Sequence, residues 1–436
     1  MAIEGRLEKL AIDGGMPVRT EPFKGNFIFD NNERQHLMEV MDNWNSNFKV
    51  KALTDAFEKK YGVDYAIATS SGSGAIHSAV AALNLEPGDE IITTATTDIG
   101  GVQGIVLQNL IPVFADWDAD TFNTDPADIE NRITGRTGGI IVTHLFGNPC
   151  DMDEIMSIAR KHDLPVIEDC AQAHLAKYKG KLVGTIGDIG CFSLGGKTLT
   201  TGGGGMIITN NRELAARAIG HSLKGAEVDM ETRSSLAPTS YRRGTPGGYA
   251  SLGDYHKMSD LSAAVGLAQF ERLDSYTQVR RHAAAILDEQ LYELPGLTIQ
   301  LVRPGNEHTY YTYGYKIDEF EMGATPINFW RAIRAEGIEI AEGPYLRGTP
   351  LYRYPIFADA QTYGNSGYPF IDEQGRKRID YNEVSLPVVE RELPKTGFIL
   401  FRSTFSDRDV ADIATAFRKV ALYYNAHRDK SISAGT

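Results

Sequence analysis

The segment Val166-Ile-Glu-Asp-Cys-Ala-Gln-Ala-His174 ends a short apolar run with a carboxylate, Asp169. A second segment, Phe192-Ser-Leu-Gly-Gly-Lys-Thr-Leu-Thr-Thr-Gly-Gly-Gly-Gly205, sets one lysine, Lys197, among glycines. A short apolar run bounded by polar residues is typical of a buried strand. Because open α/β sheets bind ligands at the carboxyl ends of their strands, a carboxylate just past such an end is well placed for chemistry.

Around these segments, the chain alternates short apolar runs with amphipathic pieces of helix length. The runs that predict buried strands are residues 90–94, 111–115, 139–143, 164–168 and 205–209. Strands that alternate with helices are the signature of a parallel sheet wrapped by helices, so we predict an α/β fold. One crossover helix is expected to begin after Asp151, whose side chain can cap it. Its apolar face is formed by Met152, Ile155, Met156 and Ala159.

The length of 436 residues suggests two or three domains. From about residue 276 the alternation weakens, and a stretch rich in Tyr, Pro and Gly precedes a final helix. Ser406 is expected to cap that helix with Asp409 in a capping box, and one stripe holds Val410, Ile413, Phe417 and Val420. We therefore predict an N-terminal arm (1–25), a large domain (26–275) and a smaller α+β C-terminal domain (276–436).

Composition excludes several classes of partner. The formal charge of −13 disfavours nucleic acid and anionic membrane surfaces as main partners. The first residues lack an apolar core of signal-peptide length, and no run of about 18 apolar residues occurs, so we expect a cytoplasmic protein. Three scattered cysteines, Cys150, Cys170 and Cys191, predict buried thiols without a disulfide framework, and no metal site is expected.

Lys197 and Asp169 together are the minimum equipment for holding pyridoxal phosphate. A Schiff-base enzyme needs an amine for the cofactor aldehyde and an anion against the pyridine nitrogen, which keeps the ring protonated. Taken alone, Asp169 reads as a helix cap or loop carboxylate, and Lys197 as a surface lysine. The occurrence of Asp169 together with Lys197, and the glycines around Lys197, favour a cofactor site.

Residues 69–75, Thr-Ser-Ser-Gly-Ser-Gly-Ala, precede an Ala-rich helical pattern that runs to about Leu83. Small residues let the backbone approach an anion, and the helix N–H groups point at it, so a phosphate fits there. A flexible turn before a surface helix fits equally well. No Gly-Lys-Ser/Thr follows, which argues against a nucleoside triphosphate. The spacing of His77, His144, His174 and His221 does not separate them from ordinary packed or solvated histidines.

Several ordered motifs resemble one known family. They are Leu10–Arg19, Gly72-Ser73, Pro87–Ile92, Pro112–Phe122, His144–Met152, Glu168–Ala173, Gly187-Asp188, Lys197 and Met258–Leu261. This order is similar to that of the DegT/DnrJ/StrS-type sugar and cyclitol aminotransferases over most of residues 10 to 275. The resemblance implies the pyridoxal-phosphate-dependent transferase fold of type I, active as a homodimer with sites shared between subunits.

The resemblance also implies roles for individual residues. Lys197 would carry the cofactor as a Schiff base and then shuttle the proton, Asp169 would pair with the pyridine nitrogen, and Gln172 would lie near the ring hydroxyl. Gly72 and Ser73 would donate to the phosphate. Family members that act as dehydratases carry histidine in place of the lysine, so Lys197 implies transamination.

Three positions depart from the family pattern. Asp98 stands where an aromatic ring usually stacks on the cofactor, and it adds negative charge. The spacing from Ser193 to Lys197 is one residue shorter than usual, which puts Ser193 as a phosphate ligand in question. Tyr255 occupies the place of an asparagine that reaches the phosphate of the partner subunit, and either Tyr255 or Lys257 would take that role.

We therefore expect an aminotransferase that moves an amino group from L-glutamate or L-glutamine to a keto or aldehyde group of a sugar, cyclitol or similar polar intermediate. Lys197 would act as nucleophile and then as general acid and base. Two alternatives are a non-transaminating pyridoxal-phosphate enzyme, such as a lyase or carbon–carbon bond former, and an idle cofactor-binding partner protein. A plain nucleotide-binding α/β protein leaves the ordered motifs unexplained.

Overall fold

A computed structural model describes residues 8–44, 48–231, 233–235, 248–340 and 345–428. Its larger sheet has seven strands in the order β1-β9-β8-β5-β4-β2-β3. Their bounds are β1 Tyr65–Thr69, β2 Glu90–Thr94, β3 Ile111–Ala115, β4 Thr137–Thr143, β5 Val166–Asp169, β8 Ile189–Gly195 and β9 Thr200–Thr209. The pairs from β3 to β8 are parallel, whereas β9 is antiparallel to both β8 and β1. The predicted strand at 205–209 therefore exists but runs opposite to the others.

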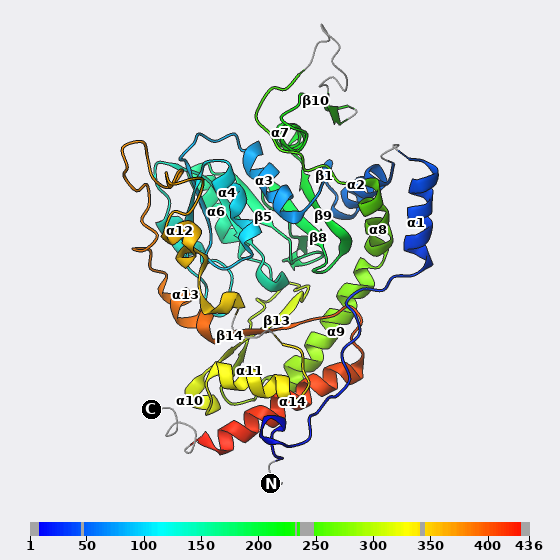
Figure 1. Cartoon of the computed structure of the whole chain (residues 1–436), viewed down its shortest axis with the longest axis vertical. Coiled ribbons are helices and arrows are strands. Elements are labelled where there is room, and N and C mark those ends of the chain that lie inside the picture. The colour runs from blue at the N-terminus through cyan, green and yellow to red at the C-terminus, as the bar shows by residue number, and fades with distance from the viewer. Residues whose placement is uncertain (1–7, 45–47, 232, 236–247, 341–344, 429–436) are drawn as a thin grey trace.

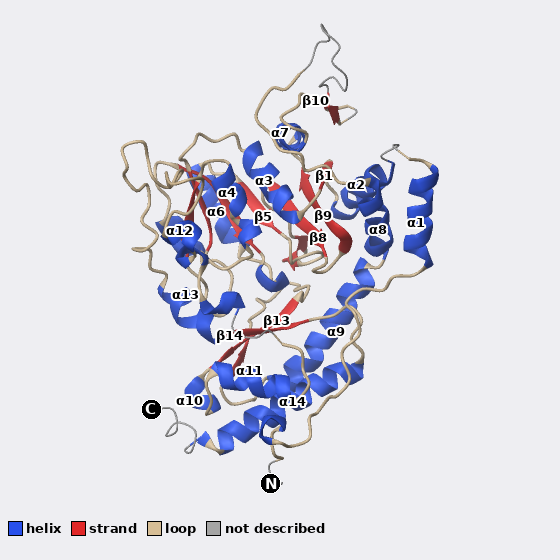
Figure 2. Ribbon diagram, in the orientation of Figure 1, coloured by secondary structure: helices blue, strands red, loops and turns tan. Residues whose placement is uncertain are grey.

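Helices cover both faces of this sheet (Figures 1 and 2). Strand side chains alternate between the faces, so Ile207 packs with α3 and α7 while Met206 and Ile208 pack with α2, α6 and α8. The helices of this part are α1 Asn31–Asp42, α2 Phe48–Tyr61, α3 Gly72–Ala82, α4 Gln103–Leu107, α5 Pro126–Asn131, α6 Met152–His162, α7 Arg212–Ser222 and α8 Asp260–Glu271. The α/β architecture predicted from the alternation of strands and helices is confirmed.

The crossover helix α6 begins where predicted, and Met152, Ile155 and Ala159 are buried on the sheet. The predicted cap is wrong in one respect, because the side chain of Asp151 makes no capping hydrogen bond. It accepts instead from Arg303 Nε at 2.7 Å, which ties the start of α6 to the C-terminal part of the chain.

A second layer of structure follows α9 (Leu273–Leu291), which leads from the larger sheet to an antiparallel sheet of β12 (Leu297–Ile299), β13 (Thr312–Ile317) and β14 (Thr396–Leu400). This sheet packs with α9, α11 and α14 in the lower part of Figure 1. The remaining helices are α10 Glu319–Met322, α11 Pro326–Ala335, α12 Pro355–Ala358, α13 Pro387–Glu392 and α14 Asp407–Ala426. Ser406 and Asp409 form the predicted capping box of α14.

Residues 351–393 return to the larger sheet. Tyr352 and Tyr381 are buried in the same hydrophobic cluster as Phe114 of β3, and Tyr381 Oη donates to Pro112 O at 2.8 Å. The division into 1–25, 26–275 and 276–436 stays a prediction; its second boundary falls inside α9.

The small elements are the strands β6 Lys177–Tyr178, β7 Lys181–Leu182, β10 Val228–Asp229 and β11 Ser234–Ser235, and the 3₁₀ turns η1 Ala11–Asp13, η2 Ile99–Gly101, η3 Leu145–Gly147, η4 Tyr345–Gly348, η5 Leu351–Arg353 and η6 Leu393–Lys395. Across the described residues, no helix combines the length and apolar character that a bilayer crossing requires.

Candidate active site

The carboxyl ends of β1, β2, β4, β5 and β8 meet at one edge of the larger sheet, because all five strands run in the same direction. Lys197 lies in the four-residue connection between β8 and β9 and is partly exposed. Its carbonyl oxygen accepts from Asn26 Nδ2 at 3.2 Å, and Asn26 Oδ1 accepts from Ser403 N at 2.8 Å. Asn26 thus holds the lysine connection from a distant part of the chain.

Asp169 is the last residue of β5 and is only 2% exposed. It accepts from Ala171 N at 3.0 Å and weakly from the Thr143 hydroxyl at 3.4 Å. Burial raises the pKa of Asp169, while the positive charge of Lys197 opposes that rise. A buried carboxylate with two neutral hydrogen-bond donors is poorly compensated, so it favours a cation placed beside it.

The glycine-rich loop before α3 forms a cradle with η2. Ser71 caps α3 by accepting from Gly74 N at 2.9 Å, so the first N–H groups of the helix face outward. A Cβ on Gly72 would lie 2.7 Å from Ser193 Cβ, and one on Gly100 would overlap Ser73 Oγ. A methyl group at either glycine would fill this cradle.

The turn that contains Asp98 connects the cradle to Asp169. Asp98 is exposed, and its Oδ1 accepts from Gly100 N at 2.9 Å at the start of η2. A Cβ on Gly101 in the same turn would lie 3.1 Å from Asp169 Oδ2. The structure therefore brings Gly72, Ser73, Asp98, Asp169, Ser193 and Lys197 to one place.

Gln172 is buried at the same edge, and its Oε1 accepts from Phe146 N at 2.7 Å. The side chain of Tyr345 also hydrogen-bonds Gln172, and burial raises the pKa of the Tyr345 hydroxyl, with the charge of Asp98 as a further cause. Tyr345 belongs to the stretch rich in Tyr, Pro and Gly that precedes the final helix.

Tyr255 is not brought to this group in its own chain. Its ring is 56% exposed on the outer surface, where Lys224 Nζ lies 4.8 Å from the ring centroid. Its backbone N–H donates to Asp254 Oδ1, and its backbone forms a bridge with Leu223. These contacts within the described part of the molecule lie outside the group of predicted site residues.

Two supporting contacts could not be read from the sequence. Asn26 reaches the site from a segment far from it along the chain and lies in no recognisable pattern. His174 is fully buried, and its Nδ1 lies 2.7 Å from the hydroxyl of Thr198, the neighbour of Lys197. The only hint for His174 was its place five residues after Asp169.

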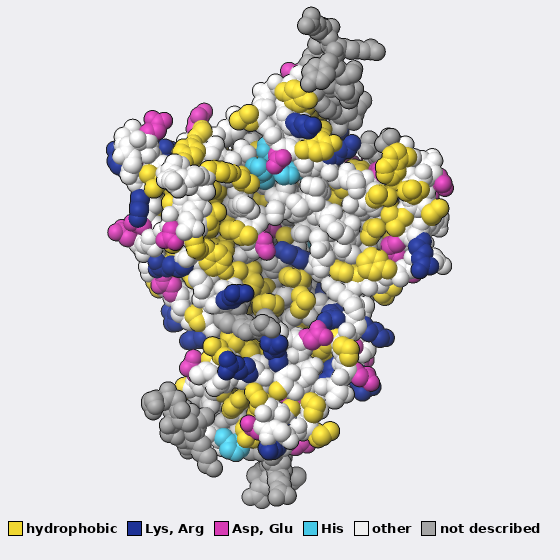
Figure 3. All heavy atoms as spheres, viewed as in Figure 1, with side chains coloured by type: hydrophobic (Ala, Val, Ile, Leu, Met, Phe, Trp, Pro, Cys, Tyr) yellow, Lys and Arg dark blue, Asp and Glu magenta, His cyan; other side chains and the backbone are white. Residues whose placement is uncertain are grey.

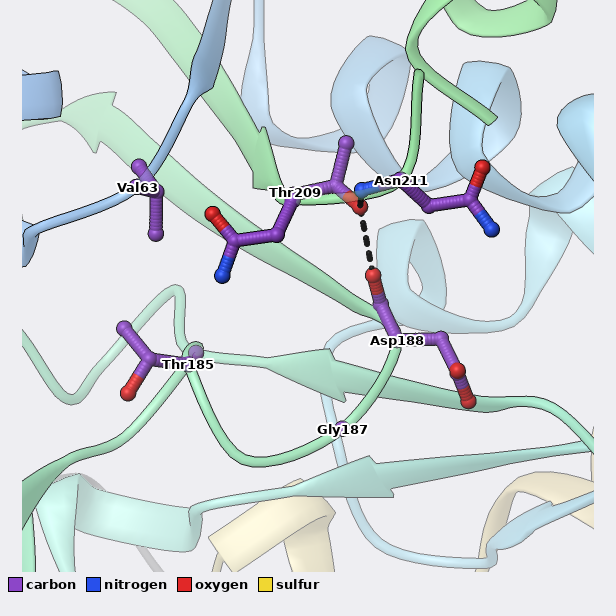
Figure 4. A pocket seen from close by; sticks show the side chains of 8 residues that line it. Val63, Thr185, Gly187, Asp188, Thr209 and Asn211 are labelled. Carbon is purple, nitrogen blue, oxygen red and sulfur yellow. Dashed lines mark hydrogen bonds between the residues drawn. The ribbon is translucent and has the colours of Figure 1, made fainter. Parts of the chain in front are cut away.

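A hollow of about 370 Å³ lies at the opposite edge of the sheet, away from Lys197 (Figure 4). Its wall includes Asp188, whose carboxylate accepts from Val166 N at 2.8 Å and whose carbonyl accepts from Thr209 Oγ1 at 2.7 Å. These groups join the ends of β5, β8 and β9, so they serve the fold. At the carboxyl edge, by contrast, the buried carboxylate of Asp169 is incompletely paired.

Comparison with known proteins decides the family. The DegT/DnrJ/EryC1/StrS aminotransferase family matches residues 28–390. The chain belongs to this family. Members of the DegT/DnrJ/EryC1/StrS family depend on pyridoxal phosphate, so the protein is a pyridoxal-phosphate-dependent aminotransferase, and the predictions of family, cofactor and enzyme class are confirmed.

Individual relatives span nearly the same length. An L-glutamine:2-deoxy-scyllo-inosose aminotransferase of Micromonospora echinospora is 33% identical over 369 residues, which is 84% of each chain. A GDP-perosamine synthase of Caulobacter vibrioides is 37% identical and covers 71% of this chain and 81% of its own. The crystal structure of an aminotransferase from Psychrobacter cryohalolentis superposes with a TM-score of 0.79 at 28% identity, over 92% of this chain and 100% of that one.

The residues of this DegT/DnrJ/EryC1/StrS member fit the cofactor. The cradle at Gly72 and Gly100 leaves room that a Cβ would take, next to the outward-facing N–H groups of α3. Asp169 offers a buried carboxylate with few hydrogen-bond donors. Lys197 offers an amine next to the turn that contains Gly195 and Gly196. An anion site, a carboxylate and an amine are the three groups that pyridoxal phosphate requires.

Proposed function

We propose that this aminotransferase moves an amino group from L-glutamate or L-glutamine to a keto or aldehyde group of a sugar, a cyclitol or a similar polar intermediate. The observation that carries the proposal is the convergence of Lys197, Asp169 and the cradle at one sheet edge. The relatives support the acceptor class, because one is named for a keto-cyclitol and another for a nucleotide-linked amino sugar.

Each residue has a role that follows from its surroundings. When bound, pyridoxal phosphate supplies an aldehyde that holds the amino group and a ring that accepts electrons. Asp169 keeps a proton on the ring nitrogen, since its buried carboxylate gains most from a cation. Lys197 would hold the aldehyde group and would move the proton at the reacting carbon as general base and acid.

The remaining predicted residues bind and orient. The N–H groups at Gly72 and Ser73 and the Ser193 hydroxyl donate to the phosphate, since they line the cradle. Gln172 is held by Phe146 and Tyr345, so its side chain would be fixed in place to orient the cofactor ring. Asp98 lies at the rim of the site, where its exposed carboxylate adds negative charge close to the bound molecules.

The visible absorbance spectrum of the protein with pyridoxal phosphate tests this function. Addition of L-glutamine or L-glutamate is expected to convert the cofactor to its aminated form in the natural protein and not in Lys197→Ala. Lys179→Ala, at an exposed lysine paired with Asp153, is the control and should behave as the natural protein does. A cofactor that binds without accepting an amino group from either donor would contradict the proposal.

The acceptor is tested in a second step. The aminated protein is mixed with a keto-cyclitol, a nucleotide-linked keto-sugar or a simple 2-keto acid, and return of the original absorbance is followed. We expect fast return with a polyhydroxylated ketone. Return only with simple 2-keto acids would overturn the acceptor class while leaving the donor reaction standing.

We also propose a homodimer in which Tyr255 completes the site of the partner subunit. Exposed apolar side chains gather along α1 and next to Tyr255; they are Met38, Met41, Trp44, Tyr249 and Leu252. Figure 3 shows hydrophobic side chains over the region of α1 and α8. Contiguous exposed apolar surface of this kind marks interaction sites.

Subunit mixing tests the shared site. Lys197→Ala and Tyr255→Ala proteins are each expected to be impaired, and a refolded mixture should regain activity because hybrid dimers contain one intact site. Light scattering should give twice the chain mass. A monomer, or a mixture no more active than the Tyr255→Ala protein alone, would contradict the proposal.

A further inference from the structure

Three histidines meet on the surface beside α3, away from Lys197. His77 comes from α3, His221 from the end of α7, and His256 from the segment that precedes α8. His77 Nδ1 lies 3.2 Å from His256 Nε2. Figure 3 shows histidine side chains gathered around an acidic one on the face over α3 and α7. The aminotransferase mechanism assigns no role to this group.

Asp254 adds a carboxylate to the group. Its Oδ2 lies 3.5 Å from His256 Nε2, and the ligand atoms of His77, Asp254 and His256 are all within 4.8 Å of one another. Zinc binds histidine nitrogen and carboxylate oxygen at about 2.0–2.2 Å in a tetrahedron, so neighbouring ligand atoms are about 3.3–3.5 Å apart. The two short distances match the edges of that tetrahedron.

We propose that His77, Asp254 and His256 bind a divalent transition-metal ion, with zinc as the ion that suits this ligand set best. The proposal does not depend on the transamination proposed above. In the single subunit Asp254 is exposed and His256 partly so, which leaves room for a fourth ligand.

The hydrogen bonds around His77 agree with a metal ligand. The side-chain amide of Gln108 lies 2.8 Å from His77 Nε2 and 3.3 Å from His221 Nε2. With the amide oxygen toward both rings, each Nε2–H donates to it, which leaves His77 Nδ1 free as a ligand; the two orientations of an amide are assigned from such networks. A metal-bound histidine typically donates its other N–H to a carbonyl group in this way.

Metal binding at this position would restrict the movement of the loop that forms the phosphate cradle. The ring of His256 lies against Gly74, where a Cβ would be 3.0 Å from His256 Cγ, and Ser70 N donates to His256 O at 2.6 Å. Ser70 and Gly74 flank the start of α3. An ion that joins His77 to His256 would therefore restrict the turn that holds the phosphate, and we expect it to slow cofactor loss.

Calorimetric titration of the holoenzyme, free of any histidine tag and treated with chelator, with ZnCl₂ tests the proposal. We expect one ion per chain and a raised melting temperature. Cobalt(II) should give the intense visible bands of a tetrahedral site. His256→Ala and Asp254→Asn should each weaken zinc binding at least about tenfold.

His282→Ala is the matched control, because His282 forms an exposed pair with Asp407 at 3.0 Å and lies in another part of the chain. It should bind zinc as the natural protein does. Absence of saturable binding, or binding that survives both His256→Ala and Asp254→Asn, would overturn the proposal. Asp254 is exposed, so Asp254→Asn gives a decisive result even where a histidine variant fails to fold.

Discussion

Glu168 and Asp169 are neighbours on β5, yet the chain supplies their carboxylates with very different numbers of hydrogen-bond donors. Glu168 accepts from Gly184 N, Ile186 N and Gly187 N at 2.6–2.7 Å and lies 3.0 Å from His144 Nε2. Asp169 has two neutral donors, one of them at 3.4 Å. Both carboxylates are buried, so the difference lies in how completely the chain itself satisfies them. The chain saturates the carboxylate of Glu168 and leaves acceptor positions of Asp169 without a donor among the described residues.

The same contrast holds for the candidate metal cluster His144, Glu168 and Cys170. His144 Nδ1 accepts from Cys150 N at 3.0 Å, which leaves its Nε2 proton for Glu168. Both ring nitrogens of His144 and the carboxylate of Glu168 thus already have partners in the fold. The surface cluster at His77 differs, because its Asp254 is exposed in the single subunit.

Asp169→Asn should give the largest functional effect. The amide cannot hold a proton on the ring nitrogen, so we expect kcat to fall by about 100-fold or more. Folding should be unharmed, because the change removes a buried charge with incomplete compensation. Turnover measures the effect on catalysis, and the melting temperature of the cofactor-free protein measures the effect on stability. A stability loss with little change in kcat would reverse the assignment of Asp169.

Glu168→Gln should show the opposite pattern. Its amide would set a donor against backbone N–H groups that need an acceptor, so we expect a loss of about 3 kcal/mol or more in the free energy of unfolding. Urea denaturation of the cofactor-free protein measures this loss. Glu130→Gln, at a surface glutamate paired with Lys161, is the control and should leave the midpoint unchanged. An unaltered midpoint in Glu168→Gln would break the comparison.

Histidines extend the comparison to pH. Burial lowers the pKa of His174 to about 3, and its Nε2 is a buried atom without a hydrogen-bond partner in the described structure. Its folded pKa lies below the unfolded value of about 6.5, so the folded state binds fewer protons between these values. The stability that neutral His174 contributes is thus complete above about pH 6.5 and is lost as the pH falls toward 3.

The measurement is the melting temperature of the cofactor-free protein from pH 8 to pH 4, with His174→Asn for comparison. We expect a flatter acid limb in the variant, even where the variant is less stable at pH 8. An identical acid limb would show that His174 is not among the groups responsible. His77 and His221, whose pKa values burial also lowers to about 4, account for the remaining slope.

How much of this structure the sequence predicts depends on how far apart along the chain the contacting residues lie. Residues 90–94 and 111–115 match β2 and β3 residue for residue, because continuous apolar runs bury on both faces. The direction of β9 was missed since β8, with its glycines, did not read as a strand; once β8 is recognised, the four-residue connection through Lys197 requires an antiparallel pair.

The site shows the same limit. Lys197 and Asp169 each lie in a local pattern that singles them out as candidates, whereas Asn26 contacts Lys197 across 171 residues. The glycines around Lys197 favour a cofactor site on the sequence alone, but Gly205 is required by the chain itself, since a Cβ there would overlap Ser71 O. A sequence therefore shows which residues carry reactive groups, but it does not show which distant residue packs against them.

Gly100→Ala should give the smallest effect and sharpen the comparison at the cradle. The added methyl group would overlap Ser73 Oγ, so Ser73 must shift from its place at the start of α3. We expect the affinity for pyridoxal phosphate to fall about tenfold, which corresponds to about 1.4 kcal/mol, with kcat at saturating cofactor little changed. Gly135→Ala, where a Cβ has no neighbour within 4 Å, is the control. Equal cofactor affinity in both variants would show that the cradle has room for more than the phosphate, and that the chain leaves this edge open for a different reason.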